Sequence, residues 1–146
     1  MKLASLCSRR LVTVSTGAPI SEVARLMRDE HVGAVVVTQD GADHLHVAGI
    51  LTDRDIVRAQ LARTADLASL STREIMTANP LVLSEGESID AAIGRLRARG
   101  VRRAPVVAED GTPIGMISAD DLLAHLAVSL IGLAGIVAQQ LHERAG

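Results

Sequence analysis

One seven-residue pattern, Gly-x-x-Thr/Ser-x-x-Asp, occurs twice and carries residue types suited to binding a phosphorylated ribose. It reads Gly49-Ile-Leu-Thr-Asp-Arg-Asp-Ile in the first copy and Gly115-Met-Ile-Ser-Ala-Asp-Asp-Leu in the second. Each copy follows a predicted strand and opens a predicted helix, so the hydroxyl takes the N-cap position and the aspartate lies in the first turn. These residues are Thr52 and Asp55, and Ser118 and Asp121. Free backbone N–H groups and the helix dipole attract phosphate there, and a carboxylate accepts hydrogen bonds from both ribose hydroxyls.

The same spacing also has a purely structural interpretation. A Ser or Thr followed three residues later by an acid at a helix start forms a capping box, which stabilises the helix without any ligand. A single copy favours that interpretation. Two copies in register, each with a glycine three residues before the hydroxyl, favour a ligand site.

The pattern belongs to a longer internal repeat, in which turn residues, Thr/Ser and Asp recur in the same order. Each copy reads as strand, helix, strand, Asp-Gly hairpin, strand and helix. The elements are expected at 12–14, 20–30, 35–38, 47–51 and 53–62, and again at 81–83, 89–99, 105–108, 113–117 and from 119 onward. This order predicts an α/β fold of the α+β type, built from two pseudo-symmetric βαββα repeats. The predicted units are a first motif at 6–63, a connector at 64–73, a second motif at 74–126 and a C-terminal helix extension at 127–146, with a short helix expected at 72–76.

The last helix is longer than its counterpart and has a broad apolar face. Its large residues step by three or four, at Leu122, Leu126, Leu130, Leu133, Val137 and Leu141. The most apolar run, 126–138, is shorter than the roughly 18 residues that span a bilayer. We therefore expect a buried helix or a dimer face without membrane contact, and a homodimer, because an exposed stripe of this size promotes aggregation in a monomer.

Composition excludes several classes of function. The 146 residues carry a net charge of −2 and 48% apolar residues, unlike a disordered chain or a general nucleic-acid binder. With no Phe, Tyr or Trp, the chain has no aromatic platform for bases or cations. Cys7 is the single cysteine, which fits a reducing, cytoplasmic setting. His44 and His46 lack further ligands for a closed metal site, and no catalytic triad or phosphate-cradling glycine loop is present, so we expect no metal and no enzyme.

The two repeats resemble a cystathionine-β-synthase (CBS) domain pair, also called a Bateman module. The resemblance covers about residues 6–126 and rests on the two motifs above, on Glu74-Ile-Met-Thr and on Gly100-Val-Arg-Arg-Ala-Pro-Val-Val. It implies that the repeats pack sheet to sheet and that two sites between them bind AMP, ADP, ATP or S-adenosylmethionine. It also implies a regulatory role without a catalytic cofactor, and pairing of two modules into a flat disc. In this family the Asp holds the ribose and the Thr/Ser helps to hold phosphate.

Carried over residue by residue, the resemblance implies two unequal sites. The first comprises Thr52, Asp55, Thr77, Leu81, Val82, Arg102 and Arg103. The second comprises Ser118, Asp121, Ser8, Val12, Val32, Gly33 and Ala34. Because Gly33 and Ala34 replace the two arginines, phosphorylated ligands are expected to prefer the first site, and the second, with Asp120 beside it, to take ligands of little negative charge. The sequence does not place Arg9, Arg10, Arg54 and Arg58, which would change this expectation by folding over either site.

The function expected from these features is a stand-alone regulatory module that binds an adenosine-containing ligand and signals to an unknown partner protein. The alternative is a non-binding interaction or scaffolding protein that acts through its C-terminal helix.

Overall fold

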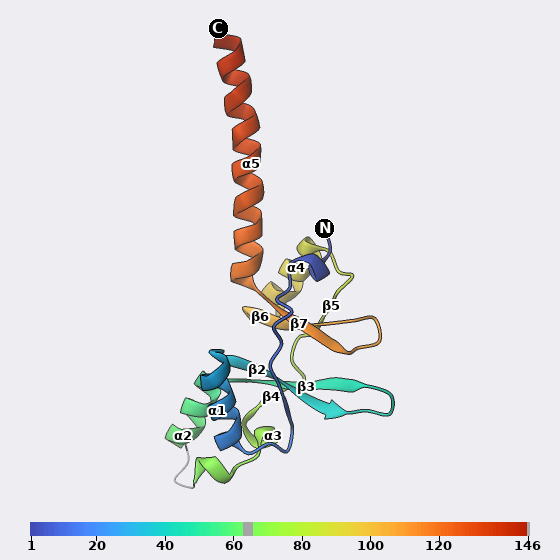
Figure 1. The fold of residues 1–146 in the computed structure, drawn as a ribbon, viewed down its shortest axis with the longest axis vertical. Helices are drawn as coiled ribbons and strands as arrows, with labels where there is room; N and C mark the ends of the chain where they lie inside the picture. Colours follow the sequence, from blue (N-terminus) through green and yellow to red (C-terminus); the bar gives the residue numbers. More distant parts are fainter. Residues whose placement is uncertain (63–65, 146) are drawn as a thin grey trace.

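In a computed structural model, which describes residues 1–62 and 66–145, the chain forms two stacked α/β halves and one projecting helix (Figure 1). The first half contains β1 (Thr13–Ser15), α1 (Ile20–Glu30), β2 (Ala34–Asp40), β3 (Leu45–Thr52), α2 (Asp53–Ala62), η2 (Leu67–Ser69), α3 (Thr72–Ile75) and β4 (Thr77–Ala78). The second half contains η1 (Leu3–Ser5), β5 (Leu83–Ser84), α4 (Ile89–Arg99), β6 (Arg103–Val107), β7 (Pro113–Ser118) and the start of α5 (Ala119–Ala145). The predicted α/β repeat is confirmed. Residues 63–65, which hold the end of the predicted first motif and the start of the predicted connector, lie outside the described residues.

The two sheets share one plan. In the first, the strand order is β1-β2-β3-β4, with β1 and β2 parallel and β2 and β3 antiparallel. In the second, the order is β5-β6-β7 with the same directions. The hairpins β2–β3 and β6–β7 extend from the same side of the molecule (Figure 1). The central strand of each sheet is buried: Val35, Val36 and Val37 are fully enclosed in the first, and Ala104, Pro105 and Val106 in the second.

Each half is completed by the segment that precedes the other half's first strand. Thr77 of β4 pairs with Ile50 in the first sheet, although it leads into the second repeat. Ser8 makes the matching bridge to Met116 in the second sheet. The buried side chains of Leu3 and Cys7 belong to the second core for the same reason. The halves therefore exchange segments, which makes each dependent on the other.

The repeated glycine is explained by this exchange. A Cβ on Gly49 would lie 2.6 Å from the Met76 sulfur and 2.8 Å from the Thr77 carbonyl oxygen. A Cβ on Gly115 would lie 2.6 Å from the Ser8 carbonyl oxygen. Both glycines thus allow a crossing segment to approach a strand closely, a packing role that needs no ligand.

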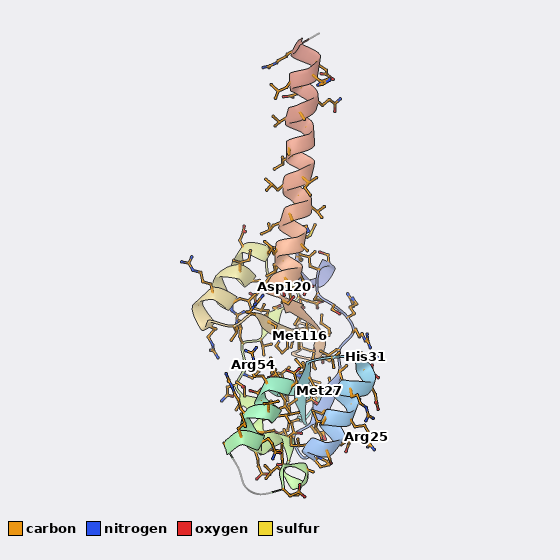
Figure 2. The ribbon with its side chains drawn as sticks, turned by 90° about the vertical axis from the view of Figure 1, so that its left-hand side faces the viewer. Arg25, Met27, His31, Arg54, Met116 and Asp120 are labelled. Atoms are coloured by element: carbon orange, nitrogen blue, oxygen red, sulfur yellow. The ribbon has the colours of Figure 1, made fainter. Side chains whose placement is uncertain are left out.

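The long helix α5 leaves the body after its first turn and projects from it (Figures 1 and 2). Leu122 is buried, but Leu126 and every later large apolar residue up to Leu141 are exposed. The expectation of a helix buried by its own chain is wrong, because the second half is only large enough to cover the first turn; the expectation of a dimer face remains open.

Candidate functional site

The two repeated motifs form the same hydrogen-bonded turn. In the first, the Thr52 backbone N–H and hydroxyl each donate to Oδ2 of Asp55 at 2.9 Å, and the Asp55 N–H donates to the Thr52 hydroxyl at 3.2 Å. In the second, the Ser118 N–H and hydroxyl donate to Oδ2 of Asp121 at 2.8 and 2.6 Å, and the Asp121 N–H returns a bond of 3.1 Å. The capping-box interpretation is therefore realised in both copies.

The capping bonds occupy one oxygen of each carboxylate. Within the described ranges, Oδ1 of Asp55 and of Asp121 makes no hydrogen bond to the protein. Capping and ligand binding are thus compatible, since the second oxygen of a carboxylate still accepts hydrogen bonds from a diol. The capping bonds also fix the orientation of the carboxylate.

A cavity of about 280 Å³ gathers all seven residues expected at the second site. Ser8, Val12, Val32, Gly33 and Ala34 come from the first part of the chain, and Ser118 and Asp121 from the end of β7 and the first turn of α5. The cavity therefore lies between the two halves. Figure 2 shows Met116, another of its lining residues, where the halves meet, and Asp120 at the base of α5.

The cavity also contains two arginines that the sequence did not assign to it. Arg10 and Arg103 both line it, together with Asp120, which was expected beside this site. The Arg10 guanidinium donates to the Glu30 carbonyl oxygen at 2.6 Å and to its carboxylate at 3.3 Å, which holds the side chain at the rim. Arg10 follows Ser8 by two residues, but only the path of the N-terminal segment across β7 shows that it reaches this site.

The residues expected at the first site are distributed differently. Thr52 and Asp55 are joined as described, and Thr77 lies on the neighbouring strand β4. Leu81 is buried, while the Val82 carbonyl accepts a hydrogen bond from Arg95 at 2.9 Å. Arg102 forms an ion pair of 3.1 Å with Asp120, and Arg103 lines the second cavity.

These arginines change the electrostatic expectation. The second cavity, for which we expected no cation from the matching strand, is lined by Arg10 and Arg103, so the preference of phosphorylated ligands for the Asp55 site loses its basis. The Arg102–Asp120 pair is highly exposed on both sides and is worth at most about 1 kcal/mol, so Arg102 can turn toward a ligand at little cost.

Other candidate features lie outside this cavity. The rings of His44 and His46, in the β2–β3 hairpin, contact each other at a tilt of 57° with centroids 4.3 Å apart. Across the described residues, no three His, Cys, Asp or Glu side chains are grouped for a metal ion. A larger hollow of about 470 Å³ between α1, α2 and η2 is lined by neither the hydroxyl nor the aspartate of either motif.

Comparison with known proteins assigns the two repeats. The model of the CBS domain matches residues 3–62 and again residues 73–128. The chain belongs to the CBS domain family. CBS domains are generally regulatory rather than catalytic, and the paired match accounts for the repeat found in the sequence.

Relatives of different lengths support this assignment. Hypoxic response protein 1 of Mycobacterium tuberculosis is 31% identical over 107 residues, covering 73% of this chain and 72% of the relative. Uncharacterized protein MK0525 of Methanopyrus kandleri is 28% identical, over 75% of this chain but only 56% of the relative. Homoserine O-acetyltransferase of Methanococcoides burtonii is 30% identical, over 82% of this chain but only 23% of the relative.

Solved structures share the fold. A protein with CBS domains from Burkholderia ambifaria superposes with a TM-score of 0.67 and 29% identity, over 81% of this chain and 83% of that one. The CBS domain pair of MJ0100, solved with 5′-methylthioadenosine and S-adenosyl-L-methionine, gives a TM-score of 0.73 at 20% identity, over 88% and 98% of the two chains. At that identity the likeness shows the fold alone.

Proposed function

We propose that this CBS pair is a regulatory module that binds an adenosine-containing ligand, AMP, ADP, ATP or S-adenosylmethionine, in the cavity beside Asp121. The supporting observation is the convergence of Ser8, Val12, Val32, Gly33, Ala34, Ser118 and Asp121 around one cavity between the halves. The module works without a catalytic cofactor.

Each wall of the cavity has a distinct role in this proposal. Oδ1 of Asp121 accepts the ribose hydroxyls, while Oδ2 remains in the capping box. Val12, Val32 and Met116 enclose the adenine, since no aromatic residue is available for stacking. Arg10 and Arg103 bind the phosphate or carboxylate end through charge-assisted hydrogen bonds. Ser118 and the first turn of α5 add hydroxyl and backbone N–H donors.

The Asp55 turn is the related second position. Its geometry matches that of the Asp121 turn to within a few tenths of an ångström in each hydrogen bond. We propose that it binds the same class of ligand with Thr77, Leu81 and Val82, and with Arg102 after release from Asp120.

Helix α5 connects the proposed ligand site to the surface through which the protein would signal. The helix begins at Ala119, directly after Ser118, and Asp121 lies in its first turn. Beyond that turn, the helix carries the exposed apolar surface through which we expect copies of the chain to pair. Ligand binding at the first turn thus acts on the element that presents this surface, in a cytoplasmic homodimer that signals to a regulated protein.

Isothermal titration calorimetry with AMP, ADP, ATP, S-adenosylmethionine and adenosine tests the proposal. Loss of the charged acceptor in Asp121→Ala weakens binding about ten- to a hundred-fold. Asp90→Ala, which removes a first-turn acid from α4 outside the cavity, leaves affinity unchanged. Unchanged affinity in the Asp121 variant would show that the ribose role is wrong.

The scaffolding alternative is favoured by one observation: both motif aspartates already serve as helix caps, while α5 is exposed. Absorbance separates the two functions, because a chain without Trp or Tyr contributes little at 280 nm. A 260 nm band in the purified protein reports bound nucleotide. No band and no thermal shift with any ligand would favour the scaffold.

A further inference from the structure

The exposed part of α5 has three faces rather than two. Five large residues, spaced alternately three and four apart, form what we call the leucine seam: Leu123, Leu126, Leu130, Leu133 and Val137. At 100° per residue, the centre of a second apolar face lies roughly 110° around the helix axis from the centre of the leucine seam. It consists of Val128 and Ile131 among alanines at 124, 127, 134 and 138.

The third face is polar toward both ends of the helix. It contains His125, Ser129, Gln139 and Glu143, with Gly132 and the exposed side chain of Ile136 between the two polar pairs. The Ser129 hydroxyl donates to the His125 carbonyl oxygen at 3.2 Å, and the Gln139 amide donates to Glu143 at 3.3 Å. These four polar residues make this the side of the helix best suited to face water.

Both apolar faces lack cover within the described chain. Leu130 and Leu133 of the leucine seam are 68% and 62% exposed, and Val128 and Ile131 of the second face are 69% and 71% exposed. By length and composition, α5 is also apolar enough to cross a membrane, and only 6% of its most apolar window is buried.

The spacing favours helix partners over a bilayer. Alternation of three and four residues is the seam of a helix that packs against another helix, whereas a membrane span needs no such register. The longest run without a polar side chain, 130–138, is far shorter than the roughly 20 residues of a span. The polar face would also lie in hydrocarbon, where unpaired amide and imidazole groups are costly.

Two apolar faces fix the number of helices. Two paired helices bury only one face of each, and the leucine seams alone would bury on the order of 1,000 Å², enough for a specific dimer. Val128 and Ile131 would remain in water. In a square bundle of four, each helix contacts two neighbours in directions about 90° apart, close to the angle between the two faces of α5.

We propose that α5 assembles this protein into a tetramer, in which the leucine seam forms pairs and the Val128–Ile131 face joins two pairs into a four-helix bundle. This goes beyond the homodimer of the proposed function by naming three further copies of the chain as the occupants of α5. Ligand sites at the base of each helix would then act on one shared bundle.

Light scattering coupled to size-exclusion chromatography, with native mass spectrometry, measures the assembly. The wild type should have four times the chain mass of 15.3 kDa. Ile131→Glu should stop at the dimer, and the double variant Leu130→Glu with Ile131→Glu should be monomeric. Gln139→Glu adds the same charge on the polar face and should remain a tetramer. Circular dichroism checks that each body is folded.

Other outcomes overturn the proposal. A wild-type dimer that Ile131→Glu leaves unchanged would refute the bundle while keeping the homodimer. A wild-type monomer would refute both, and neither result bears on ligand binding measured by calorimetry. Flotation of the wild type with phosphatidylcholine–phosphatidylglycerol vesicles, abolished by Ile131→Glu, would assign α5 to the bilayer instead.

Discussion

Replacing Gly115 with Ala tests the segment exchange on which the second cavity depends. The new Cβ would lie 2.6 Å from the Ser8 carbonyl oxygen and 3.1 Å from the Cys7 sulfur. A backbone oxygen cannot rotate away as a side-chain tip does, so the N-terminal segment must move. That movement strains the two hydrogen bonds between Ser8 and Met116, which measure 2.9 and 3.0 Å.

The size of the destabilisation caused by Gly115→Ala can be worked out from these contacts. Each backbone hydrogen bond contributes about 0.5–1.5 kcal/mol net, and overpacking costs about 1–3 kcal/mol. We expect Gly115→Ala to lower the free energy of unfolding by about 2–4 kcal/mol and the melting temperature by on the order of 10 °C. Because Ser8 lines the cavity, ligand affinity should fall as well.

The assay is thermal and urea denaturation followed by far-ultraviolet circular dichroism, since the chain has no Trp fluorescence. Gly94→Ala is the matched control. Gly94 lies within α4 with open space around its Cβ position, so the same substitution should stabilise the protein by about 1 kcal/mol. Equal stability of Gly115→Ala and wild type would refute the close-approach explanation of the repeated glycine.

Four further predictions concern other parts of the molecule. His31 ends α1 in the left-handed region at φ 53°, where its counterpart Gly100 ends α4 at φ 63°, so His31→Gly should stabilise and Gly100→Ala destabilise by about 1 kcal/mol in the same melts. Because the halves exchange segments, calorimetry should show one unfolding transition, and two separate transitions would contradict the exchange. Arg103→Ala should weaken ATP binding far more than adenosine binding, with a difference that shrinks at high salt; equal losses would mean that the arginine only shapes β6. Hydrogen bonds from Thr112, followed by the charge of His44, lower the pKa of Asp110 from 3.8. The ionised carboxylate therefore stabilises the fold above about pH 4, and this stabilisation is lost as the pH falls through the pKa of the folded state. Asp110→Asn should be less stable than wild type near neutral pH, and the unfolding free energies of the two proteins, measured by urea titration, should converge in acid.

The sequence by itself determined the local elements and the repeat. The apolar spacing of Ile20, Val23 and Met27 and the β-branched run at 35–38 depend on periodicity within a few residues, and the structure has α1 and β2 there. The N-cap hydroxyl and first-turn acid were predictable for the same reason, because a capping box is a contact between residues three apart.

The tertiary structure alone decided how distant segments meet. The crossing of Ser8 over Met116 puts Arg10 at the second cavity, and β6 directs Arg103 there as well, although alignment of the repeats assigned that arginine to the first site. The exposure of α5 could also not be predicted from the sequence, because an apolar stripe indicates that a helix packs against something but not which surface it packs against. Periodicity records which side of an element is apolar, whereas the charge of a site depends on side chains brought together from elements far apart in the chain.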